Sequence, residues 1–270
     1  MNLLVVEMRR ALHRRVVRVL ILLALVACAF AGVIGFLSSS GKTLAELHRN
    51  GATHPSVLTD WWTSGGDSAV TIAATFLLLG GFFAGAAVAG AEWRAGTITT
   101  VLTWEPRRVR LTLTRTAACG ILAFVIATGL QVIFLASFLP AVFANGTTAG
   151  ADADWWTSLS LAIARASLLT SIAAMLAAAL ATLGRNTAFA LAAVFAWMAV
   201  IEGLVRGLRP GWAQYLWGEN LTTALTWAQI KNVEFSRGPL LALLTIGIYT
   251  ALMVVAATIT FQRRDIAGSS

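Results

Sequence analysis

The feature that most constrains the fold of this chain is a series of apolar runs, each about 20 residues long, separated by short charged or polar segments. A helix needs about 20 apolar residues to cross the hydrocarbon core of a bilayer. The chain is 58% hydrophobic and only 12% charged, with a mean hydropathy of +0.77. This composition lies outside the range of soluble globular domains. We therefore expect an all-α integral membrane protein with one transmembrane domain over residues 1–270.

The apolar runs predict six transmembrane helices. The first run is about 19 residues long and no small-residue cleavage site follows it, which favours a retained span over a signal peptide. The second span contains Gly81 and Gly85, a spacing that permits close helix packing. The expected spans cover residues 19–37, 68–90, 116–143, 166–183, 188–205 and 239–261.

Residues 2–14 have an amphipathic pattern. One helical stripe carries Leu4, Met8, Ala11 and Leu12, and another carries Glu7, Arg10 and Arg14. We expect a helix in the plane of the membrane interface. The alternative is that this segment extends the first span into the cytosol.

The basic residues predict the orientation. If both termini lie in the cytosol, thirteen of the twenty lysines and arginines lie inside and six outside, as the positive-inside rule requires. The tryptophan pairs at 61–62 and 155–156 then lie at the outer interface. Arg165 falls at the start of the fourth span, from which it can reach that interface. We expect a multi-pass protein of the cytoplasmic membrane.

Other functions find little support in the sequence. The SGKT at 40–43 lacks the preceding glycine of a phosphate-binding loop and lies outside the cell in this topology. Cys28 and Cys119 lie inside apolar runs and are expected to be small core residues. The histidines lack metal-ligand spacing, so no metal site is expected. The spans carry almost no ionisable groups, which argues against an enzyme. The basic residues form short clusters beside the apolar runs, and no soluble domain is left to carry a basic face, which argues against a nucleic-acid-binding protein.

A few residues within or near the spans could contact a substrate. Glu202 lies four residues before Arg206, which favours an intrahelical ion pair, with a substrate contact as the alternative. Thr71 and Thr75 are expected to line a pathway at the interface between two copies. The segment 206–238 is rich in tryptophan but broken by proline and glycine. It is expected to re-enter the outer leaflet and cap that pathway.

The most charged stretch is GAEWRAGTITTVLTWEPRRVRLTLTR, residues 90–115, between the second and third spans. Its Glu, its Gly-Thr, its Leu-Thr and its Pro-Arg-Arg, with a basic residue opening the next span, resemble the signature of ABC-2 type transporter permeases. These are the membrane subunits of ATP-binding-cassette exporters. The closing FQRRDI at 261–266 and the six-span profile extend this resemblance over nearly the whole chain.

The resemblance implies an ABC-2 (type V exporter-like) fold in which residues 91–115 contain a coupling helix that docks into a groove of a separate ATPase subunit. This chain would bind no cofactor, because ATP and magnesium would belong to the ATPase. A second copy or a related permease would complete a homodimer or heterodimer in membrane lipid. The residues expected to contact the ATPase are Glu92, Trp93, Arg94, Gly96, Thr97, Leu102, Thr103, Pro106 and Arg108.

The expected function is export of an amphipathic or hydrophobic substrate, such as a drug, a peptide or a lipid, without catalysis by this chain itself. Few polar groups line the spans, which suits such cargo better than ions. The alternative is a membrane immunity or sensor protein that binds a toxic peptide or antibiotic without pumping. A membrane enzyme of lipid metabolism is the third possibility.

Overall fold

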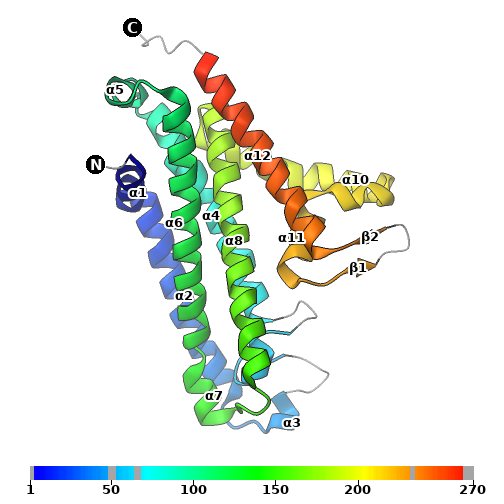
Figure 1. Cartoon of the computed structure of the whole chain (residues 1–270). Helices are drawn as coiled ribbons and strands as arrows, with labels where there is room; N and C mark the ends of the chain where they lie inside the picture. The colour runs from blue at the N-terminus through cyan, green and yellow to red at the C-terminus, as the bar shows by residue number, and fades with distance from the viewer. Residues whose placement is uncertain (1–2, 48–52, 64–67, 232–234, 264–270) are drawn as a thin grey trace.

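A computed structural model of the chain describes residues 3–47, 53–63, 68–231 and 235–263 (Figure 1). Residues 232–234 of the expected outer segment and 264–266 of the closing motif lie outside this part. Helices α1 to α12 are joined by short turns, by the non-α helical segments η2 to η4 and by a two-stranded hairpin. The elements in chain order are α1 (Leu3–His13), α2 (Arg15–Ser39), α3 (Leu44–Leu47), η2 (Leu58–Trp61), α4 (Ala69–Arg94), α5 (Ile98–Trp104), α6 (Arg108–Ala136), α7 (Leu139–Asn145), α8 (Ala153–Gly184), α9 (Thr187–Ala196), η3 (Trp197–Ile201), α10 (Glu202–Leu208), η4 (Pro210–Tyr215), α11 (Trp217–Thr226), β1 (Ile230–Lys231), β2 (Ser236–Arg237) and α12 (Pro239–Arg263).

Within the described residues, six helices are long and apolar enough to cross a membrane, which confirms the expectation of an all-α membrane protein. They are α2, α4, α6 with α7, α8, α9 through α10, and α12. Their outer surfaces carry large apolar side chains, and only 11% of the apolar window of α2 is buried inside the protein. Apolar surface on this scale requires a lipid or protein covering.

Two helices begin about two turns or more before the positions that the hydropathy profile predicts. The third long helix starts at Arg108 rather than at 116, so Arg110 and Arg115 belong to its first turns. The fourth starts at Ala153 rather than at 166, because the Asp152 side chain caps it by accepting a hydrogen bond of 2.8 Å from the backbone N–H of Trp155. In both cases a charged residue that interrupts the apolar run lies inside the helix instead of ending it.

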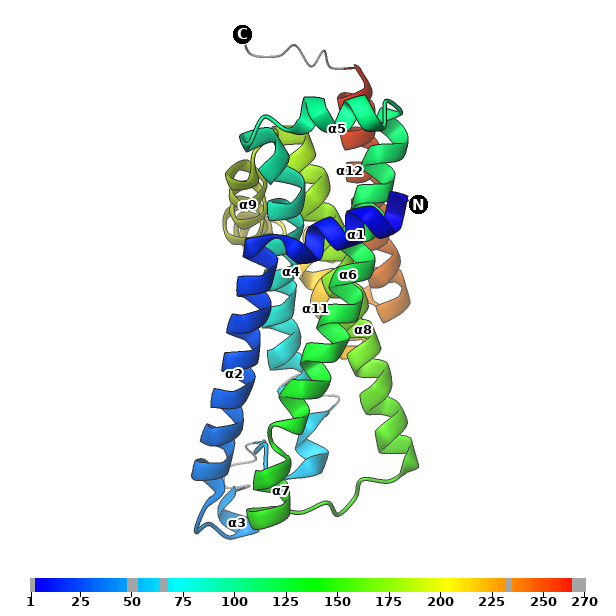
Figure 2. The same cartoon turned by 90° about the vertical axis from the view of Figure 1, so that its left-hand side faces the viewer.

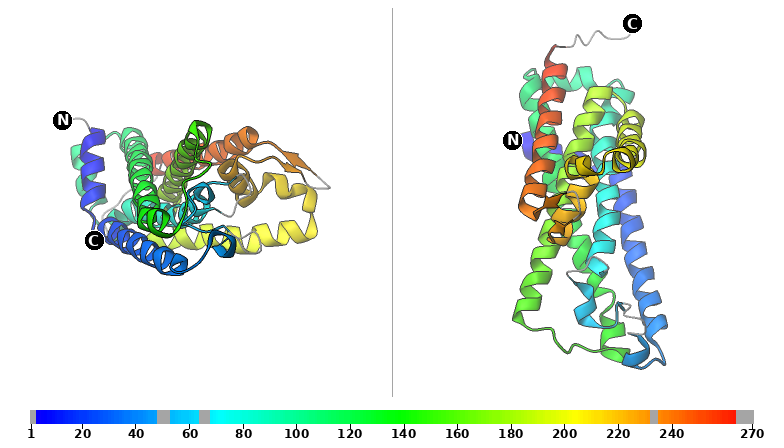
Figure 3. Two further views of the ribbon diagram at one scale, coloured as in Figure 1. Left: turned by 90° about the horizontal axis from the view of Figure 1, so that it is seen from below. Right: turned by 90° about the vertical axis from the view of Figure 1, so that its right-hand side faces the viewer.

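The long helices do not all run in the same direction. Figures 2 and 3 show α2, α4, α6 and α8 running along the length of the molecule, with α12 leaning against them. The unit α9–α10 lies across them and is seen nearly end-on in Figure 2, close to the level of α1. The hairpin and α11 lie beside the lower half of α12, not at the end where α3 and α7 lie (Figure 1). The described residues of the segment 206–238 therefore lie at the side of the molecule near its middle.

The turn between α8 and α9 explains this change of direction. Arg185 adopts a left-handed conformation with φ of 52°, and Asn186 caps α9 by accepting a hydrogen bond from the N–H of Ala188. A Cβ atom at Gly184 would overlap the ring of Phe189. A left-handed residue and a side-chain cap end one helix and start the next at a new angle.

The core is formed mainly by small residues of α4 and α8. A Cβ atom at Gly81 would lie 2.8 Å from the carbonyl oxygen of Thr170, and one at Gly85 would overlap the carbonyl of Ala174. The expected close approach at this glycine pair is confirmed. The free cysteines Cys28 and Cys119 are both buried, as expected of small core residues.

Replacing Gly85 by valine is expected to lower the free energy of unfolding by about 2 kcal/mol, because α4 and α8 must move apart to fit the new side chain. Gly80 is the matched control, since no atom outside its own helix lies within 4 Å of a Cβ placed there. Gly80→Ala should be neutral or stabilise the helix by about 0.5–1 kcal/mol. Thermal unfolding in detergent measures both, and equal effects of the two substitutions would contradict the packing argument.

Candidate functional site

The charged segment between α4 and α6 is mostly helical and is tied to the rest of the protein by buried ion pairs. Glu92, near the end of α4, lies 2.7 Å from Nη2 of Arg115 on α6 and 2.9 Å from Nη2 of Arg14 before α2. Arg115 also lies 3.4 Å from Glu7 on α1. We call these four residues (Glu7, Arg14, Glu92 and Arg115) the ion cluster. It joins α1 and the start of α2 to the end of α4 and the start of α6, which are far from them in the sequence.

The ion cluster is largely hidden from solvent. Glu7 is 3% exposed, and Glu92 and Arg115 are each 7% exposed. Two carboxylates face two guanidinium groups, so the formal charges of the four side chains cancel. Buried charges are tolerated when they are paired in this way, and removal of one partner is costly.

The contacts of α1 differ from the expected division into an apolar and a polar stripe. Glu7 and Ala11, four residues apart, are buried, whereas Leu12 is 37% exposed. Figure 2 shows α1 lying across α6, as an interfacial helix would. The acidic side of α1 thus contacts protein because the cation of Arg115 lies beneath it.

The short helix α5 packs on its inner side against α6 and α12. Ile98 and Val101 are buried in a small apolar cluster with Leu111 and Phe261. The Trp93 ring meets Phe261 edge-on at 5.7 Å, and the guanidinium of Arg185 lies 5.0 Å from the centroid of Trp93. The short helix is therefore attached to the ends of several long helices, the ends that the expected orientation places in the cytosol.

Polar side chains strengthen this attachment. Arg108 donates hydrogen bonds of 3.4 Å to the carbonyl oxygens of Phe261 and Gln262, and Arg94 donates one of 3.1 Å to Thr187. The segment 91–115 is thereby linked both to the end of α12 and to the start of α9. A displacement of α5 would be transmitted directly to α4, α6 and α12.

The residues expected to contact an ATPase divide into two groups. Glu92 is buried, and Trp93, Leu102 and Arg108 are partly buried against the protein itself. The exposed members are Arg94, Gly96, Thr97, Thr103 and Pro106. Gly96 has a φ of 66°, and a Cβ atom at this position would meet nothing within 4 Å, so it forms an open, sharp turn before α5. These five residues lie at or close to the ends of α5, and one of them, Arg94, contacts Thr187 of α9.

The residues expected to line a pathway lie apart from the two large cavities. Thr75 is exposed and donates a hydrogen bond of 3.0 Å to the carbonyl of Thr71, while the Thr71 hydroxyl lies 3.0 Å from Ser68. Neither threonine lines a cavity described below. Both lie near the start of α4.

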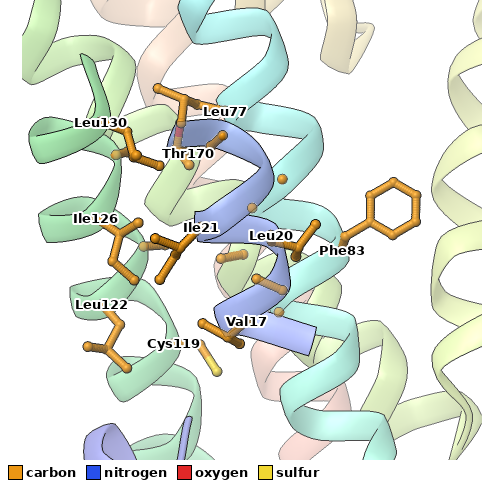
Figure 4. Close-up of a pocket in the computed structure, with 18 of the residues that line it drawn as sticks. Val17, Leu20, Ile21, Leu77, Phe83, Cys119, Leu122, Ile126, Leu130 and Thr170 are labelled. Carbon is orange, nitrogen blue, oxygen red and sulfur yellow. The ribbon is translucent and has the colours of Figure 1, made fainter. Parts of the chain in front are cut away.

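The first cavity has a volume of about 350 Å³ and lies between α2, α4, α6 and α8. Figure 4 shows Leu122, Ile126 and Leu130 of α6 along one side, with Ile21 of α2 across from them and Leu20 on the side of α2 toward Phe83. Thr170 of α8 contributes a hydroxyl, but this hydroxyl already donates to the carbonyl of Ala166 at 2.9 Å. The cavity therefore suits an apolar occupant.

A second cavity of about 510 Å³ lies between α8, α9, α11 and α12. Aromatic and thioether side chains line it, including Trp197, Tyr215, Trp217, Tyr249 and Met253. The Tyr249 hydroxyl donates a hydrogen bond of 3.0 Å to the carbonyl of Tyr215. This cavity too is largely apolar.

Glu202 forms the intrahelical ion pair that its spacing predicts, at 3.4 Å from Arg206. Its side chain is 1% exposed and also accepts hydrogen bonds of 3.0 and 3.1 Å from the backbone N–H of Gly218, and one of 3.2 Å from Nε1 of Trp197. The carboxylate thus holds the first turn of α11 against the π-helical turn η3. These contacts make Glu202 a structural anchor.

Comparison with known proteins does not assign the chain to a family. No family model matches it, and no curated protein matches it significantly.

Proposed function

We propose that this chain is the permease subunit of an ATP-binding-cassette exporter of the ABC-2 type. It would move an amphipathic or hydrophobic substrate across the cytoplasmic membrane with ATP hydrolysed by a separate ATPase subunit. The observation that carries the proposal is α5, a short helix with an exposed polar surface that is fastened to several membrane helices.

The mechanical argument rests on where a soluble motor could act. A motor can move a membrane protein only through parts that protrude from the bilayer, and the segment 95–107 is the longest connection between long helices on that side. Buried contacts of Ile98 and Val101 hold this segment to α4, α6 and α12, and the ion cluster joins α4 to α6 beside it. Force applied to the exposed surface of α5 would therefore tilt those helices instead of bending a loop.

The cavities favour the proposed class of cargo. Both large cavities are lined almost entirely by apolar and aromatic side chains. Ions need rings of carbonyls or charges, whereas apolar and amphipathic molecules are bound by such surfaces. A second permease copy or a related permease would cover part of the exposed apolar surface of the spans.

The proposal is tested by purifying the tagged full-length chain from its native membrane in mild detergent. We expect an ATPase subunit with a phosphate-binding loop to co-purify in a one-to-one ratio, and the complex to hydrolyse ATP. Membranes without the tagged chain provide the background. Recovery of the chain alone, with no hydrolysis above background, would exclude the exporter and favour a non-pumping membrane protein.

A further inference from the structure

Arg165 is an isolated charge in the first half of a long apolar helix. It is the only charged residue of α8 other than Asp154 at the start of the helix. Because α8 begins at Ala153, Arg165 lies about three turns inside the helix, further from the end than its place in the hydropathy profile implies. Ionisable residues inside membrane helices are rare and commonly functional.

Two tryptophans hold the Arg165 guanidinium from separate parts of the chain. Its central carbon lies 5.4 Å from the ring centroid of Trp62, in the turn after η2, and 5.2 Å from that of Trp227, at the end of α11. Trp62 is 8% exposed and Trp227 is 44% exposed. A guanidinium between aromatic rings is held by cation–π attraction, and its edge remains free to donate hydrogen bonds.

No carboxylate or carbonyl partner of Arg165 occurs within the described residues, and its Nε is buried without a hydrogen bond. The two buried arginines of the described residues, Arg115 and Arg237, both have polar partners, and Nη2 of Arg115 makes an ion pair but no hydrogen bond. Arg115 pairs with Glu92 and Glu7, and Arg237 donates to Asn220 at 2.9 Å and to Thr245. Arg165 thus retains donors in a fork that matches the oxygens of a phosphate or carboxylate.

The surface around Arg165 indicates which kind of anion can reach it. Leu161 and Leu168 lie one turn to either side on the same face of α8, and they are 54% and 39% exposed. A dissolved anion would have to approach across this apolar surface. The acyl chains of a lipid would instead pack against the leucines while its head group met the guanidinium.

We propose that Arg165, held between Trp62 and Trp227, binds the phosphodiester head group of an anionic membrane lipid. The site would recognise the lipid by a bidentate hydrogen bond from the guanidinium, with Leu161 and Leu168 contacting the chains. Trp227 covers the exposed side of the guanidinium. This inference is independent of the ATPase, so it stands or fails separately from the proposed function.

The test uses the purified full-length chain in nanodiscs of phosphatidylcholine with or without phosphatidylglycerol. Native mass spectrometry measures how much phosphatidylglycerol stays bound relative to phosphatidylcholine. We expect Arg165→Gln to lower this preference at least about tenfold, and Arg165→Lys to lower it less because the charge remains while the fork is lost. Arg15→Gln is the control, since Arg15 is an exposed cation at the other end of the long helices.

A second variant keeps the test decisive if Arg165→Gln does not fold. Trp227 is partly exposed and has a φ of 54°, a conformation that glycine adopts readily, so Trp227→Gly should fold and lower the lipid preference several-fold. Unchanged preference in both Arg165→Gln and Trp227→Gly would overturn the proposal. Complete competition by millimolar inorganic phosphate would also overturn it, by showing that a dissolved anion occupies the site.

Discussion

Replacing Arg115 by glutamine should lower the free energy of unfolding by about 3–5 kcal/mol, the usual cost of removing one partner from a buried ion pair. Arg115 is 7% exposed, and its guanidinium forms ion pairs with both Glu7 and Glu92. Without it, among the ion pairs of the described residues, Glu92 would keep only Arg14 and Glu7 would keep only the exposed Arg10, 3.2 Å away. The fall should appear as a lower midpoint of thermal unfolding in detergent.

The double variant Glu92→Gln with Arg115→Gln distinguishes a paired cluster from two independent contacts. Removing both charges leaves fewer unpaired groups, so the double variant should be more stable than the sum of the single effects predicts. Arg110→Gln is the matched control. The Arg110 side chain is 57% exposed, and its one ion pair within the described residues is with Glu105, at 3.3 Å. That change should cost less than about 1 kcal/mol. Equal losses for Arg110→Gln and Arg115→Gln would contradict the importance of the cluster.

The apolar helices can be predicted from the sequence because hydropathy reports directly which segments avoid water. The residues at which these helices begin cannot be predicted in this way. Arg115 and Arg165 interrupt apolar runs, and the hydropathy profile places helix ends there, but the first is paired with acids and the second lies between tryptophans. A charge that is satisfied locally allows the helix to continue, and those partners come from distant parts of the chain.

The position of α9–α10 cannot be predicted for a different reason. Its composition is that of a span. Hydropathy describes what surrounds a helix but not its direction. Here the direction depends on the left-handed turn at Arg185 and on the hydrogen bond that Glu202 accepts from the backbone N–H of Gly218. The spacing of Glu202 and Arg206 reveals the ion pair, while the contact with Gly218 joins residues in different elements.

The ion cluster also escapes prediction from the sequence. The family resemblance implies that Glu92 contacts an ATPase, and no local sequence pattern suggests a buried partner for it within this chain. That partner, Arg14, lies 78 positions earlier, and nothing in the spacing connects the two. The structure turns Glu92 inward, so Glu92→Lys would place a third cation beside Arg14 and Arg115. That variant would disturb folding and is a poor probe of docking.

The exposed surface of α5 offers a cleaner probe. Thr97 and Thr103 are exposed, and within the described residues neither hydroxyl donates to a residue outside its own segment. Tryptophan at either position would add bulk to the surface without disturbing Ile98 or Val101 beneath it. Gly96→Trp is a less specific probe, because any side chain at a φ of 66° also strains the backbone.

We expect Thr97→Trp and Thr103→Trp to lower transport-coupled ATP hydrolysis at least about tenfold, equivalent to about 1.4 kcal/mol of lost coupling. Thr157→Trp is the control, because Thr157 is an exposed threonine in the first turns of α8, at the opposite end of the molecule. The measurement is ATPase activity of the reconstituted complex, beside thermal unfolding of each variant. All three should unfold near the wild-type temperature, since none of the threonines is buried. If ATPase activity falls only in the variants at positions 97 and 103, and all three variants keep their stability, the ATPase acts on α5. Wild-type activity of both variants would mean that the ATPase acts on another part of the chain.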